Sequence, residues 1–324
     1  MSNLTPPRSS VSAVVPAYNS ELSLPELARR LQPVLESAAR DYELIIVDDG
    51  SRDRTWPVIQ ELARDHSWIK GIHLMRNYGQ HNAVLCGIRL AQNDVIVTLD
   101  DDLQHPPEEI PKLLEKLTDD IDVVYGAPAQ ETHGLWRDLA SQVTKMALQS
   151  AMGAPIARKA GPFRAFRTQI RDAFAGYDGP YVSVDVLLTW GTTRFAAVEV
   201  RHEQRTLGKS NYTFRKLVVH AINMITGFST LPLQLSSLIG FLLTLVGIAA
   251  LIFVIVRFLI QGGGVPGFSF LASMIAIFSG AQLFSLGIIG EYLARMHLRT
   301  MQHPTYAVRE VTSAVETQKI DGRR

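Results

Sequence analysis

The chain has almost no cysteine and no surplus of charge. Cys86 is the single cysteine among 324 residues, which excludes an internal disulfide and a cysteine-rich zinc site, and its neighbours Leu85 and Gly87 indicate a thiol packed in the core. The 32 lysines and arginines nearly balance 31 acidic residues, giving a formal net charge of +1. Without a global basic field the chain is a poor candidate for binding nucleic acid, so any anion site must rest on local arginines.

The sequence also lacks the glycine-rich loops that usually cradle phosphate. No G-x-G-x-x-G and no G-x-x-x-x-G-K-[ST] pattern occurs, so a dinucleotide-dependent oxidoreductase and a P-loop NTPase are both disfavoured. If a ligand of this protein carries phosphate, its charge must be neutralised by something other than a glycine loop.

Long uncharged runs near the C-terminus contribute to a composition that is 47% apolar. Residues 233–257 and 268–290 are each long enough to cross a bilayer, which takes about 20 apolar residues. A pair of buried helices in a soluble domain is the alternative, but two uninterrupted runs of this length favour a transmembrane hairpin. Because no ionisable residue lies within residues 233–256 or 268–290, the hairpin is predicted to be an anchor rather than a channel.

Basic residues flank the two predicted spans on the same side. Arg215 and Lys216 precede the first span, Arg295 and Arg299 follow the second, and the connecting loop has only Arg257 near its edge. The positive-inside rule then places both termini and the large N-terminal region in the cytoplasm, as in an integral protein of a bacterial inner membrane. Four glycines in the spans could let the helices pack closely and permit a homo-oligomer: Gly240, Gly247, Gly280 and Gly287.

Residues 11 to about 200 alternate short apolar runs with helical patterns. Five runs are predicted strands: residues 11–15, 43–47, 69–74, 95–99 and 122–125. Four amphipathic stretches between them are predicted helices: residues 25–39, 55–65, 81–91 and 107–117. This alternation predicts an α/β domain with a mixed, largely parallel, Rossmann-like sheet, whose ligands bind beyond the carboxyl ends of the strands.

Polar clusters follow the first, second and fourth predicted strands and should converge on one cleft: residues 16–19, 48–51 and 100–104. The last reads Asp100-x-Asp102-x-Gln104, and its oxygen ligands suit Mg²⁺ or Mn²⁺, which takes further ligands from water and substrate phosphates. Because aspartates cannot neutralise phosphate directly, a metal between Asp100, Asp102 and the ligand is expected. An acidic loop that caps the helix starting near residues 106–109 is the alternative.

Asp101 is expected to differ from its two neighbours. Alternate residues of an extended segment share a side, so Asp100 and Asp102 should reach the cation while Asp101 points away.

In the second cluster, Asp48 and Asp49 can accept hydrogen bonds from a base N–H or a ribose hydroxyl. A simple turn with an N-cap would explain that cluster equally well.

Four motifs together resemble the family-2 glycosyltransferases of the polyprenyl-phosphate type in order and spacing: Val14-Val15-Pro16-Ala17-Tyr18-Asn19, Val47-Asp48-Asp49-Gly50-Ser51, Arg76-Asn77-Tyr78-Gly79-Gln80-His81 and Leu99-Asp100-Asp101-Asp102-Leu103-Gln104-His105-Pro106-Pro107-Glu108. Members of that family include dolichyl-phosphate mannose synthase and the undecaprenyl-phosphate glucose and aminoarabinose transferases. The resemblance covers nearly the whole chain, including the end of the second span at residues 290–295. It implies a GT-A nucleotide-sugar-binding fold followed by a two-helix membrane hairpin.

The resemblance implies an inverting enzyme that moves a sugar from a nucleotide diphosphate donor, with uridine as the preferred base, to a membrane polyprenyl phosphate. Eight residues would bind the donor: Pro16, Tyr18, Glu21, Asp48, Asp49, Gln80, Asp100 and Asp101. Asp100, Asp102 and Gln104 would hold the Mg²⁺ or Mn²⁺ ion. Asp102, Arg164 and Arg205 would be catalytic, and the acceptor phosphate would be bound by Arg164, Arg205 and Ser210. Solvation at the surface is the rival interpretation for the arginines.

Two departures from the family pattern bear on catalysis. Pro162 stands where many relatives have an aspartate before the Phe-Arg pair, and residues 126–128 lack an arginine that several relatives carry there. The first loss is tolerable because a phosphate monoester, with a second pKa near ~6, is already an anionic nucleophile at neutral pH. No residue is assigned as general base. A membrane-anchored nucleotide-sugar sensor or scaffold is the non-enzyme alternative, and a processive polysaccharide synthase is disfavoured because its Gln-x-x-Arg-Trp motif is absent.

The chain is predicted to have five parts: a flexible N-terminus (1–10), a cytoplasmic catalytic domain (11–212), a juxtamembrane segment (213–231), two transmembrane helices (232–290) and a cytoplasmic tail (291–324). Within the catalytic domain, residues 134–152 read as an amphipathic helix. Trp136 favours a place for this helix in the membrane interface beside the acceptor, and packing on the domain core is the alternative.

Overall fold

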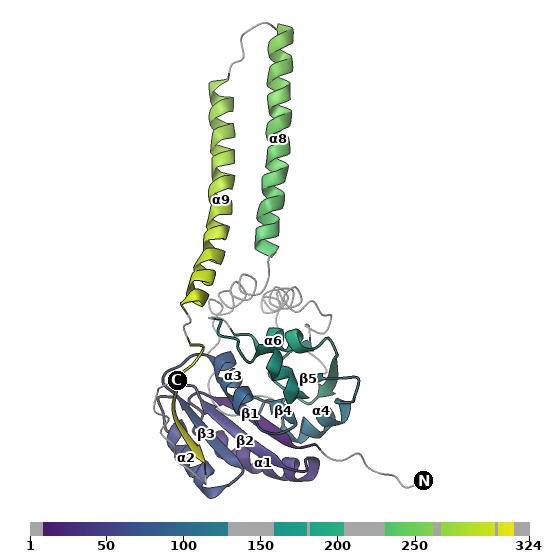
Figure 1. Ribbon diagram of the computed structural model, residues 1–324, viewed down its shortest axis with the longest axis vertical. Coiled ribbons are helices and arrows are strands. Elements are labelled where there is room, and N and C mark those ends of the chain that lie inside the picture. Colours follow the sequence, from purple (N-terminus) through teal and green to yellow (C-terminus); the bar gives the residue numbers. More distant parts are fainter. Residues whose placement is uncertain are drawn as a thin grey trace, which may run out of the picture.

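The computed structural model describes residues 9–128, 159–179, 182–203, 231–261, 267–301 and 304–313. They form an eight-stranded mixed sheet between two layers of helices, with a pair of long helices that projects away on the side of α3 and α6 (Figure 1). The order of strands across the sheet is β7-β5-β6-β4-β1-β2-β3-β8.

The first four strands make up the parallel centre of the sheet. β1 (Val11–Ala17) pairs in parallel with β2 (Tyr42–Asp48) on one side and with β4 (Val95–Thr98) on the other, and β3 (Ile69–Leu74) continues the sheet beyond β2. The chain therefore reverses its direction of travel across the sheet between β3 and β4. Such a switch point, here between β1 and β4, opens a crevice at the carboxyl ends of the strands, where α/β sheets bind ligands.

Helices cover both faces of the sheet. One face packs against three helices: α1 (Leu24–Ala38), α2 (Thr55–Asp65) and α4 (Ile110–Lys116). The other packs against α3 (Gln80–Leu90) and α6 (Val184–Gly191). Successive strand residues feed opposite cores, so that Leu44 of β2 faces the first core and Ile45 faces the second. This three-layer packing explains why the four central strands are buried along almost their whole length.

The predicted strands and helices between residues 11 and 125 are confirmed, with ends shifted by at most three residues. The bounds of β3 and α2 are those predicted, and β5 (Val123–Pro128) has the largest shift. The helix predicted at 107–117 is divided into a short 3-10 turn, η1 (Pro107–Glu109), and α4. The α/β class with a mixed, largely parallel sheet is therefore confirmed.

Three strands were not predicted. β6 (Arg164–Arg167) lies antiparallel between β4 and β5, and β7 (Phe195–Val200) pairs in parallel with β5. β8 (Val308–Ser313) pairs antiparallel with β3 at the far edge, within the segment predicted to be a tail. The chain thus returns from the long helices and completes the sheet next to β3 (Figure 1).

The long helices are α8 (Leu231–Gln261) and α9 (Phe268–Thr300), which lie side by side (Figure 1). Their segments Pro232–Ile260 and Ile277–Leu298 are long and apolar enough to cross a membrane, as predicted. The first segment extends past both ends of the predicted 233–257, and the second begins and ends later than the predicted 268–290. The two segments include three charged residues, Arg257, Glu291 and Arg295. The orientation of the hairpin in a membrane stays a prediction.

The two long helices touch at small side chains. The hydroxyl of Ser236 lies 2.8 Å from that of Ser285 across the pair. A Cβ added at Gly247 would come within 2.8 Å of the Phe278 ring. The other three glycines singled out in the sequence have no such neighbour, because open space surrounds Gly240, Gly280 and Gly287. Close packing through glycine is therefore limited to one position of the four.

Candidate functional site

A left-handed residue follows each of the first four strands. The described part of the chain has four residues with positive φ: Asn19 (56°) after β1, Gly50 (67°) after β2, Gly79 (96°) after β3 and Leu103 (59°) after β4. For a residue with a side chain this conformation costs roughly 1–3 kcal/mol, and such residues cluster at functional sites. The backbone therefore marks the carboxyl edge of β1 to β4 as the place where the chain accepts strain.

The loop after β1 is tied to the loop after β2. The Asn19 amide donates to the Ser51 hydroxyl at 2.9 Å, and the Arg52 amide donates to the Asn19 side-chain oxygen, also at 2.9 Å. Glu21 accepts the Arg54 amide at 2.9 Å, so one of its oxygens holds the beginning of α2. Tyr18, which is predicted to bind the sugar donor, lies in the same loop and is 37% exposed.

Asp48 is fully buried, and both of its oxygens have partners inside the protein. Its Oδ1 accepts the Ser51 amide at 3.0 Å, which closes the turn after β2. Its Oδ2 lies 2.7 Å from Nδ1 of His73, a residue of β3 whose ring stacks on Trp56. Pro16, which is also predicted to bind the donor, is likewise buried, in β1. The structure thus places Asp48 behind the crevice, as a support for the turn.

Asp49 closes the loop that follows β3. The Tyr78 amide donates to its Oδ1 at 2.7 Å and the Gly79 amide to its Oδ2 at 2.8 Å. Burial raises the pKa of Asp49 to about 6, although the two backbone donors act in the opposite direction. Gly50 must be glycine here for two reasons, its φ and the backbone of Arg76, which would lie 2.5 Å from an added Cβ. Direct binding of a nucleoside by Asp48 and Asp49 stays a prediction.

The three carboxylates after β4 are held by different parts of the fold. Gln80, at the beginning of α3, donates its side-chain amide to Oδ1 of Asp100 at 2.6 Å. Asp101 accepts the Ser20 hydroxyl from the loop after β1. Asp102 accepts the Gln104 amide at 3.1 Å within its own turn. The three carboxylates belong to the loop 100–104, called the acidic loop from here on. The acidic loop therefore contacts the segments after β1 and β3 at the switch point.

The electrostatics of Asp100 favour a counter-cation. Burial raises the pKa of Asp100 to about 7, and the like charges of Asp102 and Asp101 add to this shift, while Arg164 and the Gln80 hydrogen bond oppose it. Burial lowers the pKa of the nearby His105 to about 4, and His202 adds to that shift, so His105 is neutral near pH 7. The loop consequently brings carboxylates together without a protonated histidine beside them.

The acidic loop fits a cation that a substrate helps to hold. Among the residues that the structure describes, no group of three or more His, Cys, Asp or Glu side chains has a metal-binding arrangement. Mg²⁺ usually needs one or two protein carboxylates and completes its shell with water and phosphate oxygens. Asp100 and Asp102 match that donor set, and a cation between them would offset the repulsion that adds to the effect of burial on the pKa of Asp100. A role for Gln104 as a third ligand stays a prediction.

Arg164 lies beneath the acidic loop. It is 2% exposed, its Nε donates to the Thr98 hydroxyl at 3.0 Å, and its Nη1 forms an ion pair with Asp185 of α6. The Thr98 hydroxyl in turn donates to the Pro162 carbonyl at 2.6 Å. Surface solvation, the rival interpretation of this arginine, is therefore wrong. Its predicted contact with the acceptor phosphate stays a prediction.

Several predicted features fall outside the described residues. They are Arg205, Ser210, the amphipathic helix at 134–152 and all but the last residue of the juxtamembrane segment at 213–231. The structure in turn shows residues that the sequence reasoning missed, namely Ser20, His73 and Asp185. No local pattern singles out these residues, since each acts on a partner from another element.

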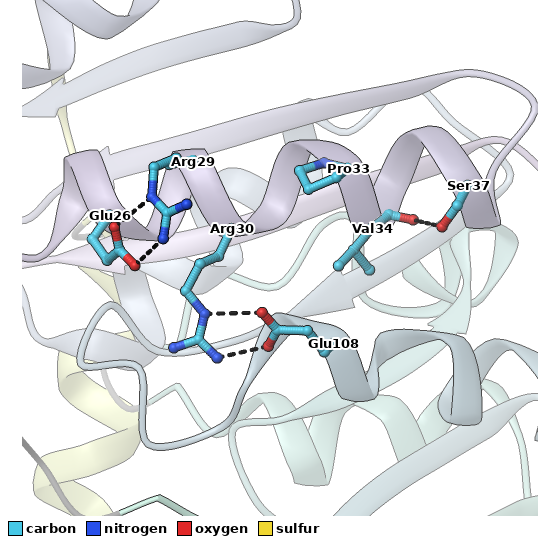
Figure 2. A pocket seen from close by; sticks show the side chains of 7 residues that line it. All are labelled: Glu26, Arg29, Arg30, Pro33, Val34, Ser37 and Glu108. Carbon is cyan, nitrogen blue, oxygen red and sulfur yellow. Dashed lines mark hydrogen bonds and ion pairs between the residues drawn. The ribbon is translucent and has the colours of Figure 1, made fainter.

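A groove lies between α1 and η1 (Figure 2). Its walls contain none of the predicted site residues: they are Glu26, Arg29, Arg30, Pro33, Val34, Ser37 and Glu108. The Arg30 guanidinium donates to both Glu108 oxygens, at 3.0 and 2.7 Å, and so fastens η1 to α1 (Figure 2). The charges of the groove pair with one another, and the Arg30–Glu108 pair holds η1, which follows residues 100–104, against α1.

Comparisons with known proteins agree with this geometry. The family model described as glycosyl transferase family 2 matches residues 12–173. The undecaprenyl-phosphate 4-deoxy-4-formamido-L-arabinose transferase of Pseudomonas aeruginosa (strain LESB58) is 35% identical over 94% of this chain and 91% of its own length. The protein of the same name from Klebsiella pneumoniae (strain 342) is 33% identical over 96% of each chain.

A solved structure with the same fold is that of glucosyl-3-phosphoglycerate synthase from Mycobacterium tuberculosis in complex with Mn²⁺, UDP-glucose and phosphoglyceric acid. It aligns with a TM-score of 0.51 at 18% identity and covers 67% of this chain and 78% of its own. At this identity the likeness concerns the fold, and it confirms the predicted GT-A architecture.

Proposed function

The chain belongs to glycosyl transferase family 2, and on that premise we propose that it transfers a sugar from a UDP-sugar to undecaprenyl phosphate, with inversion at the anomeric carbon. The observation that carries the proposal is the acidic loop of Asp100, Asp101 and Asp102 at the β1/β4 switch point, in a chain with two helices able to cross a membrane. The named activity of the relatives supports the acceptor, and the UDP-glucose and Mn²⁺ complex of the structural neighbour supports the donor and a divalent cation.

The residues near the carboxyl ends of the strands have different roles in the proposed binding of the donor. Asp48 and Asp49 fix the loops after β2 and β3, while Tyr18 remains exposed on the loop after β1. Gln80 holds Asp100 in place, so the carboxylate of Asp100 does not have to be ordered when the ligand arrives. A divalent cation bound to Asp100 and Asp102 would neutralise the donor diphosphate and stabilise it as it departs.

The proposed reaction is a single displacement. An oxygen of the acceptor phosphate attacks the anomeric carbon as the bond between that carbon and the diphosphate oxygen breaks. The products are a polyprenyl-phosphate-linked sugar and a nucleoside diphosphate. The attacking phosphate has a second pKa near ~6 and carries no proton that must be removed at pH 7, so the reaction does not need a carboxylate in the place of Pro162.

The full-length protein in nanodiscs with undecaprenyl phosphate and Mg²⁺ or Mn²⁺ provides the test. We expect mass spectrometry to find a lipid-linked monosaccharide with one member of a panel of UDP-sugars that includes glucose and 4-deoxy-4-formamido-L-arabinose. Asp102→Ala should reduce the rate of product formation on the order of 100-fold. The control Asp65→Ala, at an exposed site on α2, should leave this rate unchanged. Donor binding without transfer to any lipid phosphate would refute the proposal and favour a sensor or scaffold.

A further inference from the structure

The edge strand β8 has a bulge at the end that meets the crevice. Its pairing with β3 is regular from Lys70 opposite Ser313 to His73 opposite Glu310, and then Leu74 pairs with Val308. Arg309 is therefore the extra residue of β8, which has no partner in the ladder. Bulges of this kind re-aim a side chain and are frequent at sheet edges beside active sites.

The bulge aims Arg309 at two atoms of the β3 end. Its Nη1 lies 3.5 Å from Nε2 of His73, a long contact, and its Nη2 donates to the Met75 carbonyl at 3.2 Å. The next residue, Glu310, contacts α2 instead, through the side chain of Gln60 at 3.2 Å. Two neighbouring residues of one strand thus have separate partners, and those of Arg309 lie at the crevice.

The contact with His73 leads to the turn after β2. A guanidinium can only donate and a carboxylate can only accept, so His73 between them must accept at Nε2 and donate from Nδ1. The Nδ1–H then points at Oδ2 of Asp48, 2.7 Å away, and Asp48 holds the Ser51 amide. Arg309 therefore favours the one neutral tautomer of His73 that can support the turn.

The contact with Met75 leads to the loop after β3. The Met75 amide donates to the Ala307 carbonyl at 2.9 Å, so both backbone groups of Met75 are held by the C-terminal segment. The following residues include Tyr78 and Gly79, which bind Asp49, and Gln80, which binds Asp100. Both contacts of Arg309 thus lead to loops that line the crevice.

We propose that β8 is part of the donor site, and that Arg309 is a positioning residue that fixes the loops after β2 and β3 through His73 and Met75. The proposal rests on the proposed function only for the nature of the ligand, a nucleotide sugar. It also gives the C-terminal segment a function: the chain that leaves the long helices sets the shape of the donor end of the crevice.

The test compares Arg309→Gln and Arg309→Lys with the control Glu310→Gln in the full-length protein. Hydrogen–deuterium exchange reports the amides of residues 75–80, and titration with UDP, GDP, CDP and dTDP finds the nucleotide that the wild type binds. We expect Arg309→Gln to speed exchange at Tyr78 and Gly79 and to weaken nucleotide binding and raise the donor KM about tenfold, equal to ~1.4 kcal/mol. Arg309→Lys should recover part of both effects, and Glu310→Gln should resemble the wild type.

The outcomes separate this proposal from the proposed function. Unchanged exchange at residues 75–80 in Arg309→Gln overturns the positioning role, whatever the nucleotide affinity. Faster exchange with unchanged nucleotide affinity overturns the assignment of β8 to the donor site, as does an equal rise in the donor and acceptor KM. A wild type that binds none of the four nucleotides refutes the proposed function, and exchange at Tyr78 and Gly79 still decides whether Arg309 fixes the loop.

Discussion

The buried ion pair beneath the acidic loop offers the sharpest prediction. Arg164 is 2% exposed and forms an ion pair with Asp185, so Asp185→Leu leaves a buried guanidinium without its ion-pair partner. Breaking a buried pair in this way costs about 3–5 kcal/mol. For a domain of this size each kcal/mol lowers Tm by ~2–4 °C, so the variant should melt ~6–20 °C below the wild type. Replacing both residues, as Arg164→Met with Asp185→Leu, should recover most of that loss, because a well-packed apolar pair of similar volume is tolerated.

The assay is thermal unfolding followed by tryptophan fluorescence, together with sugar transfer by the same samples. The matched control is Arg64→Ala, whose pair with Asp65 is exposed and worth at most about 1 kcal/mol. If the double variant is stable but inactive, Arg164 serves the reaction beyond its structural pairing, as its predicted catalytic role requires. A Tm for Asp185→Leu within the range of the control, or a double variant as unstable as the single one, would refute the reasoning.

Three further predictions follow from the loops around the crevice. Asp102→Ala should reduce the transfer rate on the order of 100-fold, and Asp101→Ala should reduce it much less; equal losses would contradict the separation of the two carboxylates. Because burial raises the pKa of Asp49 from 3.8 to about 6, the native state binds this proton more tightly than the unfolded state. The contribution of Asp49 to the free energy of unfolding is therefore full below pH ~4 and falls by up to roughly 3 kcal/mol as pH rises through 6. Urea unfolding measured across this pH range should show that slope for the wild type and not for Asp49→Asn. Gly50→Ala should lower Tm and raise the donor KM, because its φ and the adjoining loop leave no room for a Cβ, whereas Gly161→Ala, in open space, should do neither.

The predicted strands have a sequence pattern that lies within the strand and its neighbouring helices, whereas the strands that were missed depend on distant parts of the chain. β1 to β5 are apolar runs separated by amphipathic helices, and this alternation can be read within a short window. β8 has six residues, and its pairing with β3 arises only after the chain has passed through both long helices. The pairing depends on distant chain segments, so no periodicity near residue 308 predicts it.

The candidate site shows the same division. The sequence places carboxylates after the strands, and that arrangement suffices to predict that Asp48, Asp49 and Asp100 gather at one edge. It does not show which oxygens are already occupied. All four oxygens of Asp48 and Asp49 accept bonds from Ser51, His73 or the loop after β3, and these partners depend on the folded position of other loops.

The occupied and charged groups together explain why the acidic loop suits a cation. Arg164 is the cation that opposes the raised pKa of Asp100, but the charge of Arg164 is already matched by Asp185. The pair therefore adds no net positive charge beneath the loop. Burial and the charges of Asp102 and Asp101 raise the pKa of Asp100 to about 7. A diphosphate alone would be repelled by such a loop, whereas a diphosphate that arrives with a divalent cation would be attracted. We therefore expect donor affinity to collapse when the divalent cation is chelated, and nucleotide binding that persists in EDTA would show that the acidic loop does not face the diphosphate.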